Sequence, residues 1–222
     1  MIPYTDLHRH APALPGTLGI QNLMNPDTVE QQLQVPGFYS IGLHPWHLHP
    51  DHWQEDLALL EQFIQHPRVK AIGEAGLDRL TGLPLALQTA VFEAMIALSE
   101  KAQKPLIIHA VRTHHEIAVL HNRYQPSQAW ILHGFNNKWA IASAFAAKNV
   151  FFSFGAALLQ HRSPAREVLL QLPLEKIFLE SDDKELEIAL LYQEAARCKE
   201  TTEDELKENI YQRFCLLFDH HE

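Results

Sequence analysis

Short apolar runs alternate with longer amphipathic segments along the chain. The short runs are rich in β-branched and aromatic residues, as the buried strands of a parallel sheet are. They predict eight strands, over residues 2–7, 17–22, 38–43, 69–74, 104–109, 128–133, 149–154 and 176–180. Strands that alternate with helices are typical of an α/β fold with a parallel sheet, and eight of them are what a (β/α)8 TIM barrel requires.

The longer segments carry apolar residues at helical spacing, most clearly over 84–103. Thr202 and Glu205 add a capping-box pattern at the start of the last helix. The predicted helices cover residues 27–34, 51–65, 84–103, 113–123, 137–147, 164–171, 184–198 and 202–218. Between His10 and Leu18 there is too little chain for a crossover helix, so we expect the first crossover helix of the barrel to be missing and a loop to replace it.

Polar groups that can bind a metal ion follow several of these strands. Two of them, His8 and His10, are separated by one residue at the end of the first extended segment. Side-chain alternation along such a segment places both imidazoles on the same side of the backbone. The groups that follow the other strands are His44, Glu74, His109, His133 and the segment Glu180-Ser181-Asp182. The carboxyl ends of barrel strands meet at one face, so we expect these side chains to gather there.

Four histidines and two carboxylates make up the predicted ligand set, which is His8, His10, Glu74, His109, His133 and Asp182. Mixed nitrogen and oxygen donors without a thiolate suit zinc, manganese, iron or nickel and hold magnesium less well. Six ligands exceed the needs of one catalytic zinc ion, so the sequence predicts two divalent ions, with Glu74 as the bridge between them. Asp182 either accepts a proton from metal-bound water or only coordinates.

Composition narrows the class of protein. The chain has 222 residues, of which 46% are hydrophobic, and we expect residues 1–222 to form one domain. The formal charge of −9 argues against a broad basic face that wraps duplex DNA, but metal ions can supply the charge that a phosphodiester needs. Cys198 and Cys215 form no metal-binding motif. The sequence shows no signal peptide and no membrane-spanning stretch, so we expect a cytoplasmic protein.

The motifs together resemble those of the TatD family of metal-dependent deoxyribonucleases, within the amidohydrolase-like TIM-barrel superfamily. They are Asp6-x-His8-x-His10, Gly42-Leu43-His44-Pro45, Ile72-Gly73-Glu74-Ala75-Gly76-Leu77-Asp78, Ile107-Ile108-His109, Leu132-His133-Gly134-Phe135 and Leu179-Glu180-Ser181-Asp182. The resemblance implies a distorted TIM barrel and the same six metal ligands. It also implies that His44 touches the substrate or orders the rim of the pocket, although a turn before Pro45 is the simpler role. Glu180 is then a partner of a ligating histidine or a salt-bridged residue, and Asp78 braces the loop after its strand.

Three segments depart from the family pattern. Ala110-Val111-Arg112 follows His109 where the family has Ser-Arg-Asp, Gly134-Phe135-Asn136-Asn137 replaces Cys-Phe-Ser-Gly, and the proline after Asp182 is absent. Arg112 retains a planar fork that can bind a phosphate. The changes leave the metal ligands intact and alter the residues that face the substrate, so the type of reaction is better predicted than the substrate.

The sequence therefore predicts a metal-dependent hydrolase that cleaves phosphodiester bonds of DNA at strand ends, with metal-bound water activated beside Asp182 and Glu74. It predicts no membrane and no obligate protein partner. One alternative is a hydrolase of amides, esters or lactones on the same metal centre. Such enzymes often bridge their ions with a modified lysine, whereas Lys70 lies at the wrong end of its strand. The other alternative is a binding protein without catalysis.

Overall fold

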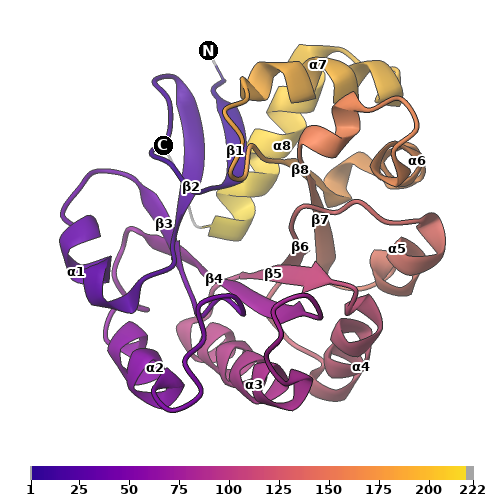
Figure 1. Ribbon diagram of the computed structural model, residues 1–222. Helices are drawn as coiled ribbons and strands as arrows, with labels where there is room; N and C mark the ends of the chain where they lie inside the picture. The colour runs from indigo at the N-terminus through magenta and orange to yellow at the C-terminus, as the bar shows by residue number, and fades with distance from the viewer. Residues whose placement is uncertain (1, 219–222) are drawn as a thin grey trace. The chain divides into compact units, whose positions relative to one another are not determined.

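The structure, a computed structural model, describes residues 2–218 and confirms the alternation of strands and helices (Figure 1). The strands are β1 (Tyr4–Arg9), β2 (Thr17–Leu23), β3 (Phe38–Ile41), β4 (Val69–Asp78), β5 (Leu106–Val111), β6 (Trp130–Leu132), β7 (Val150–Phe154) and β8 (Ile177–Leu179). The helices are α1 (Val29–Gln32), α2 (Trp53–Glu61), α3 (Leu85–Ala102), α4 (His114–Tyr124), α5 (Trp139–Ala146), α6 (Pro164–Gln171), α7 (Ile188–Lys199) and α8 (Glu203–Phe218). Short 3-10 helices cover Pro26–Thr28, Ala156–Leu159 and Leu174–Lys176.

The strands pair in chain order. The sheet runs from β1 to β8 without a change of order, and the registers of β1 with β2, β3 with β4, β4 with β5, and β7 with β8 are parallel. Arg9, at the end of β1, also bridges in parallel to Asp182, just beyond β8. This order, with helices between the strands, confirms the predicted TIM-barrel fold class.

Contacts along the chain group the residues into two compact units. The terminal unit contains the beginning of the chain up to Gln21 and the part from Leu132 onward, and the central unit contains Asn22–Ile131. Each has an apolar core of its own. In the central unit, the ring of Phe92 on α3 packs against the buried Trp130, with ring centroids 5.7 Å apart. In the terminal unit, Phe135 packs against Phe152 at 5.0 Å. That the whole chain is one domain stays a prediction.

Helices cover the strands within each unit. In the central unit α3 packs along β4, and in the terminal unit α7 and α8 pack against β1 (Figure 1). The capping box predicted for α8 is present, because Thr202 Oγ1 accepts from Glu205 N and a Glu205 carboxylate oxygen accepts from Thr202 N. None of the helices among residues 2–218 combines the length and the apolar character that crossing a membrane requires.

The connection between β1 and β2 lacks a helix, as predicted. Only residues 10–16 lie between the two strands, yet Tyr4 pairs with Thr17 in parallel register. Gly16 adopts a φ of 79° at the end of this loop, a left-handed conformation that glycine takes without a steric penalty. Arg9 holds the other end of the loop, because its Nε donates to the carbonyl oxygen of Ala11 at 2.6 Å.

Several strands run further than the sequence predicts, among them β1, which ends at Arg9 and not at residue 7. The prediction ends one strand at Glu74 and another at His109, but β4 continues to Asp78 and β5 to Val111, so both side chains lie within strands. The two extensions pair with each other, with Gly76 opposite His109 and Asp78 opposite Val111. A Cβ atom on Gly76 would lie 1.9 Å from the carbonyl oxygen of His109, so only glycine allows this close approach.

A buried carboxylate ties β1 to the end of β8. Asp6 accepts hydrogen bonds from the backbone N of Ser181 at 2.8 Å, from Ser181 Oγ at 2.7 Å and from an Arg9 guanidinium nitrogen at 3.1 Å. Burial raises the pKa of Asp6, and the bonds from Ser181 and the charge of Arg9 oppose that rise. These contacts compensate the cost of burying the carboxylate and position the residue that precedes Asp182.

We expect Asp6→Ala to lower the free energy of unfolding by about 3–5 kcal/mol, because Arg9 would then be a buried charge without its counterion. Urea unfolding measures this change. The matched control is Glu93→Ala, which breaks an exposed ion pair with Arg123 and should cost less than about 1 kcal/mol. Equal losses in the two variants would show that Asp6 does not fasten β1 to β8.

Candidate metal centre

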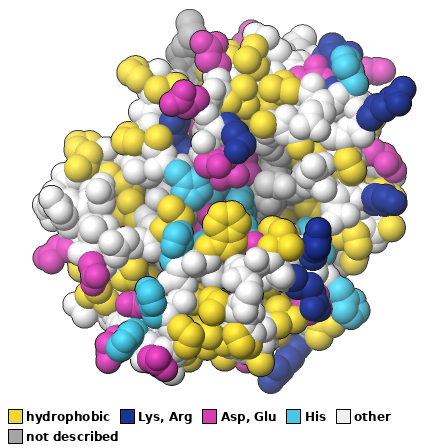
Figure 2. Space-filling model, viewed as in Figure 1, with side chains coloured by type: hydrophobic (Ala, Val, Ile, Leu, Met, Phe, Trp, Pro, Cys, Tyr) yellow, Lys and Arg dark blue, Asp and Glu magenta, His cyan; other side chains and the backbone are white. Residues whose placement is uncertain are grey.

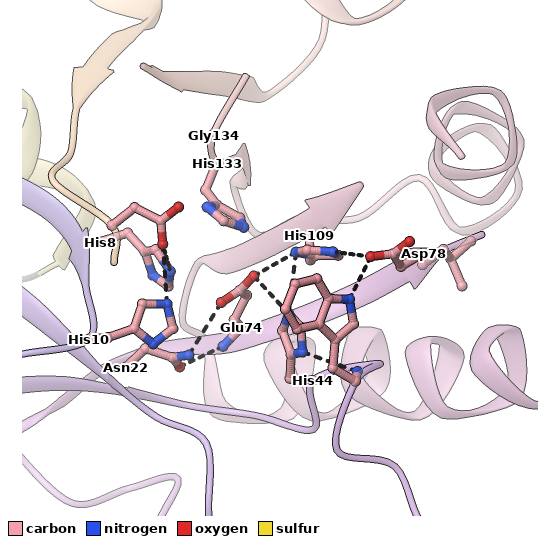
Figure 3. A network of polar contacts seen from close by, with 12 residues as sticks. His8, His10, Asn22, His44, Glu74, Asp78, His109, His133 and Gly134 are labelled. Carbon is pink, nitrogen blue, oxygen red and sulfur yellow. Dashed lines mark hydrogen bonds and ion pairs between the residues drawn. The ribbon is translucent and has the colours of Figure 1, made fainter. Parts of the chain in front are cut away.

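The central unit brings three predicted site residues together. Glu74 Oε1 lies 2.8 Å from His109 Nδ1 and 3.1 Å from His44 Nε2, and these two imidazole nitrogens are 3.3 Å apart (Figure 3). Glu74 comes from β4, His109 from β5, and His44 from the loop after β3. Glu74 and His44 are buried, with exposed fractions of 2% and 5%. Three atoms of the kinds that can bind a metal ion, two imidazole nitrogens and a carboxylate oxygen, therefore lie close together within this unit.

Asp78 determines which nitrogen of His109 faces Glu74. Burial raises the pKa of Asp78, but hydrogen bonds from His109, Trp46 and the backbone of Leu80 outweigh that effect, and the net pKa is lowered. The ionised carboxylate can only accept, so His109 Nε2, 3.0 Å away, is the donor. If the imidazole carries this proton alone, the lone pair of Nδ1 faces Glu74, which is the form in which a histidine binds a metal ion.

His44 has the opposite tautomer. Its Nδ1 accepts from the backbone N of Trp46 at 3.1 Å, and a backbone N can only donate. In a neutral His44 the proton is therefore on Nε2, the atom that faces Glu74 and His109. His44 thus acts as a hydrogen-bond donor toward the pair, whereas His109 offers a lone pair.

Asn22 fixes the other side of Glu74. The Asn22 amide nitrogen lies 3.3 Å from Glu74 Oε2, and its Oδ1 accepts from the backbone N of Glu74 at 2.8 Å. Ser40 Oγ donates to the same Oδ1 at 3.2 Å and thereby assigns the orientation of the amide group. The Glu74 carboxylate is held at both oxygens, so it cannot turn away from His109.

The terminal unit holds a second group of donors. Asp182 Oδ1 lies 3.2 Å from His10 Nε2 and 3.8 Å from His8 Nε2. The backbone of Asp182 pairs with both sides of this His-x-His segment, because its N donates to the His8 carbonyl and its carbonyl oxygen accepts from His10 N. Asp182 adopts a left-handed φ of 55°, which is uncommon outside glycine and recurs at functional sites. Its side chain is 33% exposed, so solvent and substrate can reach it.

His133 and Glu180 complete the donors of the terminal unit. Glu180 is fully buried, and its Oε1 accepts from the backbone N of Gly134 at 2.5 Å and lies 3.3 Å from His133 Nδ1. Its Oε2 is buried and has no hydrogen-bond partner among the described residues. The rings of His133 and His8 lie 4.5 Å apart. The expectation that Glu180 contacts a predicted ligand is met, since Glu180 Oε1 lies beside His133.

Both groups fit a divalent ion by donor type and spacing. Ligand atoms about 2.0–2.1 Å from one tetrahedral ion are about 3.3 Å from each other. In the central group the two atoms that offer a lone pair, Glu74 Oε1 and His109 Nδ1, are 2.8 Å apart. In the terminal group Asp182 Oδ1 lies 3.2 Å from His10 Nε2 and 3.8 Å from His8 Nε2. All donors are imidazole nitrogens or carboxylate oxygens. The buried Glu180 Oε2 adds a carboxyl oxygen without a hydrogen-bond partner among the described residues, which a nearby cation would stabilise.

The other residues singled out by the sequence lie near these groups or away from them. Arg112 directly follows β5, which ends at Val111, and its exposed side chain makes no hydrogen bond or ion pair with residues 2–218. Lys70 lies at the start of β4, with its ammonium 5.2 Å from the centre of the Phe38 ring. Lys70 is therefore far along β4 from Glu74, as the sequence predicts.

Sequence reasoning missed two residues that hold the central group. Asn22 was not selected at all, and Asp78 was expected to brace a loop, which it does through Leu80 N at 2.7 Å, but not to orient His109. The position of Asp78 near Glu74 could have been predicted, because side-chain alternation along a strand places residues 74, 76 and 78 on the same face. Asn22 ends the predicted strand 17–22, but a neutral amide was not among the groups selected as able to bind a metal ion.

A cavity of about 470 Å³ opens in the central unit beside this group. It is lined by Met24, Asn25, Pro26, Asp27, His47, His49 and Asp56. Among its lining residues, His47 has its ring 5.7 Å from that of His44. Two carboxylates in its lining repel a phosphate, so the cavity suits an uncharged or cationic group.

Comparison with known proteins places the chain in a family. The family model described as TatD related DNase matches residues 21–219. A protein of Haemophilus influenzae named as a metal-dependent hydrolase is 29% identical over 158 residues, which cover 68% of this chain and 60% of that protein. The 3′-5′ ssDNA/RNA exonuclease TatD of Edwardsiella piscicida is 32% identical over 149 residues, which cover 64% of this chain and 56% of that enzyme. The matches thus span less than two thirds of these relatives' length.

The fold has the same relatives. A crystal structure of a TatD homologue from Escherichia coli K12 superposes with a TM-score of 0.89 over 100% of both chains, at 22% sequence identity. This structural similarity shows the fold, and the match to the family model shows the family. Together they support one conclusion: the chain belongs to the family of TatD-related DNases.

Proposed function

We propose that the protein is a metal-dependent nuclease that hydrolyses phosphodiester bonds in single-stranded nucleic acid. The observation that carries the proposal is that each unit holds a group of buried or half-buried nitrogen and oxygen donors, and that a carboxylate orients a histidine in each. The exonuclease of Edwardsiella piscicida, whose name gives single-stranded DNA and RNA as substrates, supports the choice of substrate. DNA at strand ends is the substrate we expect first.

We assign one divalent ion to each group. In the central unit, Glu74 and His109 coordinate, while Asp78 fixes the tautomer of His109 and His44 donates to the substrate or to Glu74. In the terminal unit, His8, His10, His133 and Asp182 coordinate, and Glu180 orients His133. Such ions lower the pKa of bound water toward about 7 and stabilise the charge on phosphoryl oxygens. That Glu74 bridges two ions stays a prediction.

Asp182 is the residue we assign to proton transfer. It is the most exposed carboxylate of the two groups, and its position between His8 and His10 is fixed by backbone pairing with β1. A carboxylate held in this way can accept a proton from an attacking water without moving. Arg112, exposed directly after β5, is assigned to a phosphate of the substrate.

The charge of the surface agrees with attack on ends and single strands. On the face shown in Figure 2, Lys and Arg side chains lie mostly toward the right-hand side, where acidic and histidine side chains also occur. With a net charge of −9, the protein has little means of binding a long duplex through its phosphates. A cytoplasmic location and the lack of an obligate protein partner stay predictions.

Activity should depend on added metal and on Asp182. Chelator-treated protein is incubated with end-labelled single-stranded DNA, and Mg²⁺, Mn²⁺ or Zn²⁺ is then added. We expect the DNA to be shortened from one end, and only when metal is present. For Asp182→Asn we expect kcat to fall about 10²- to 10⁴-fold, because the amide cannot accept the proton.

The matched control for that assay is Asp183→Asn. Asp183 is adjacent in sequence and 60% exposed, and its partner Lys184 is its neighbour, so this variant should keep full activity. Intact DNA with every metal, in protein shown to have bound metal again, would contradict the proposed nuclease function.

Asp78 should act through His109. We expect Asp78→Asn to weaken metal binding about 10- to 100-fold, because an amide no longer enforces the tautomer that presents Nδ1. Isothermal titration with Zn²⁺ measures the affinity. Asp27→Asn removes an exposed carboxylate that lies in the same unit and contacts none of the donors, and it should leave the affinity unchanged. An unchanged affinity in Asp78→Asn would show that Asp78 only braces its loop.

A further inference from the structure

Trp46 combines exposure with a fixed position. Its side chain is 62% exposed, although tryptophan is usually largely buried. Both of its nitrogen atoms nevertheless donate to residues of the central group, the backbone N to His44 Nδ1 at 3.1 Å and the indole Nε1 to Asp78 Oδ2 at 2.6 Å. Because these two bonds hold the residue at both ends, the indole ring is ordered while much of its surface faces solvent.

The ring lies at the edge of the donor group. Its centroid is 5.5 Å from that of His44 and 6.0 Å from that of His109, with interplanar angles of 83° and 74°. The histidine rings therefore meet the indole nearly at right angles and do not stack on it. An aromatic face stays available beside the residues to which we assign the phosphate chemistry.

This chemistry suits a nucleobase. Every base has a π face, and stacking on an aromatic side chain needs no positive charge, which suits a protein with a net charge of −9. A base is attached to the sugar next to each phosphate, so a phosphodiester bound at His109 carries a base within reach of the indole. A packing role explains a buried tryptophan, but it does not explain one that is exposed and held by two hydrogen bonds.

We propose that Trp46 stacks on the nucleobase next to the phosphodiester that is cleaved and thereby selects unpaired strands. The inference rests on the proposed function of the same site. In a duplex each base is already stacked between its neighbours, and only an unpaired or terminal base can exchange that stacking for the indole. Trp46 is accordingly a substrate-binding residue, and its contribution appears chiefly in KM.

The test compares two substitutions on two substrates. Trp46→Ala removes the ring, and Trp46→Phe keeps an aromatic face but loses the bond to Asp78. The substrates are a single-stranded oligodeoxynucleotide and the same oligonucleotide with abasic sites at its terminal nucleotides. Stacking contributes about 1–3 kcal/mol per base, so Trp46→Ala should raise KM roughly 5- to 150-fold on the normal strand while kcat changes little.

Two comparisons separate stacking from a structural role. On the abasic strand, Trp46→Ala and the unaltered protein should have the same KM, and Trp46→Phe should stay close to the unaltered protein on both substrates. Tyr124→Ala is the matched control, since Tyr124 is 39% exposed, lies at the end of α4 and contacts Arg123, away from the donor group. Equal losses on both substrates, or a Phe variant as impaired as the Ala variant, would overturn the proposal.

A binding measurement decides the inference without turnover. Single-stranded oligonucleotide added to chelator-treated protein should quench tryptophan fluorescence, and Trp46→Phe should lose this quenching although the other three tryptophans remain. If the protein cleaves no DNA under any metal, the proposed function fails, and the quenching still reports on stacking. Quenching that is absent, or equal in Trp46→Phe, contradicts the stacking role.

Discussion

The burial of the Glu74 carboxylate is the constraint on which the central group depends. An ionised carboxylate that is only 2% exposed is costly unless its oxygens are paired. Asn22 pairs Oε2, and Oε1 faces the lone pair of His109 Nδ1 at 2.8 Å. A cation between these two atoms, either a proton or a metal ion, satisfies both lone pairs at once. The neighbouring strands thus create a place where positive charge is favoured.

A buried carboxylate next to a histidine is also found in the terminal unit. The fully buried Glu180 lies beside His133, just as Asp78 lies beside His109. In each unit, a carboxylate therefore contacts one ring nitrogen of a histidine, and the other ring nitrogen can bind a second partner. The main chain contributes as well, because Gly134 N donates to Glu180 and the Asp182 backbone pairs with both sides of the His8–His10 segment. Gly134 adopts a φ of 55°, and this glycine occupies the position where the family pattern has a cysteine.

Much of the fold could be predicted from the sequence, because a buried parallel strand is short and continuously apolar, and such runs are distinct from amphipathic helices. The six predicted ligands were chosen for the same reason, as polar residues next to these runs, and as ligands they stay predictions. The exact extent of β4 could not be predicted, since Ala75 to Asp78 join the strand only by pairing with Ile108 to Val111. Hydrogen bonds between side chains of different strands could not be predicted from the sequence either. The contact of Asn22 with Glu74 and the orientation of His109 by Asp78 were therefore found only in the structure. The short α1 was predicted as a longer helix, but Pro26 and a 3-10 turn take up its start.

The proposed function requires one metal ion at the donors of each unit. Metal content per chain, measured by mass spectrometry on protein loaded with Zn²⁺ or Mn²⁺ and then desalted, tests it most directly. His10→Ala removes a donor of the terminal unit and His109→Ala a donor of the central unit, while circular dichroism confirms that both variants are folded. The account predicts two ions in the unaltered protein and one in each variant. No more than one ion in the unaltered protein, or two ions in either variant, would contradict it.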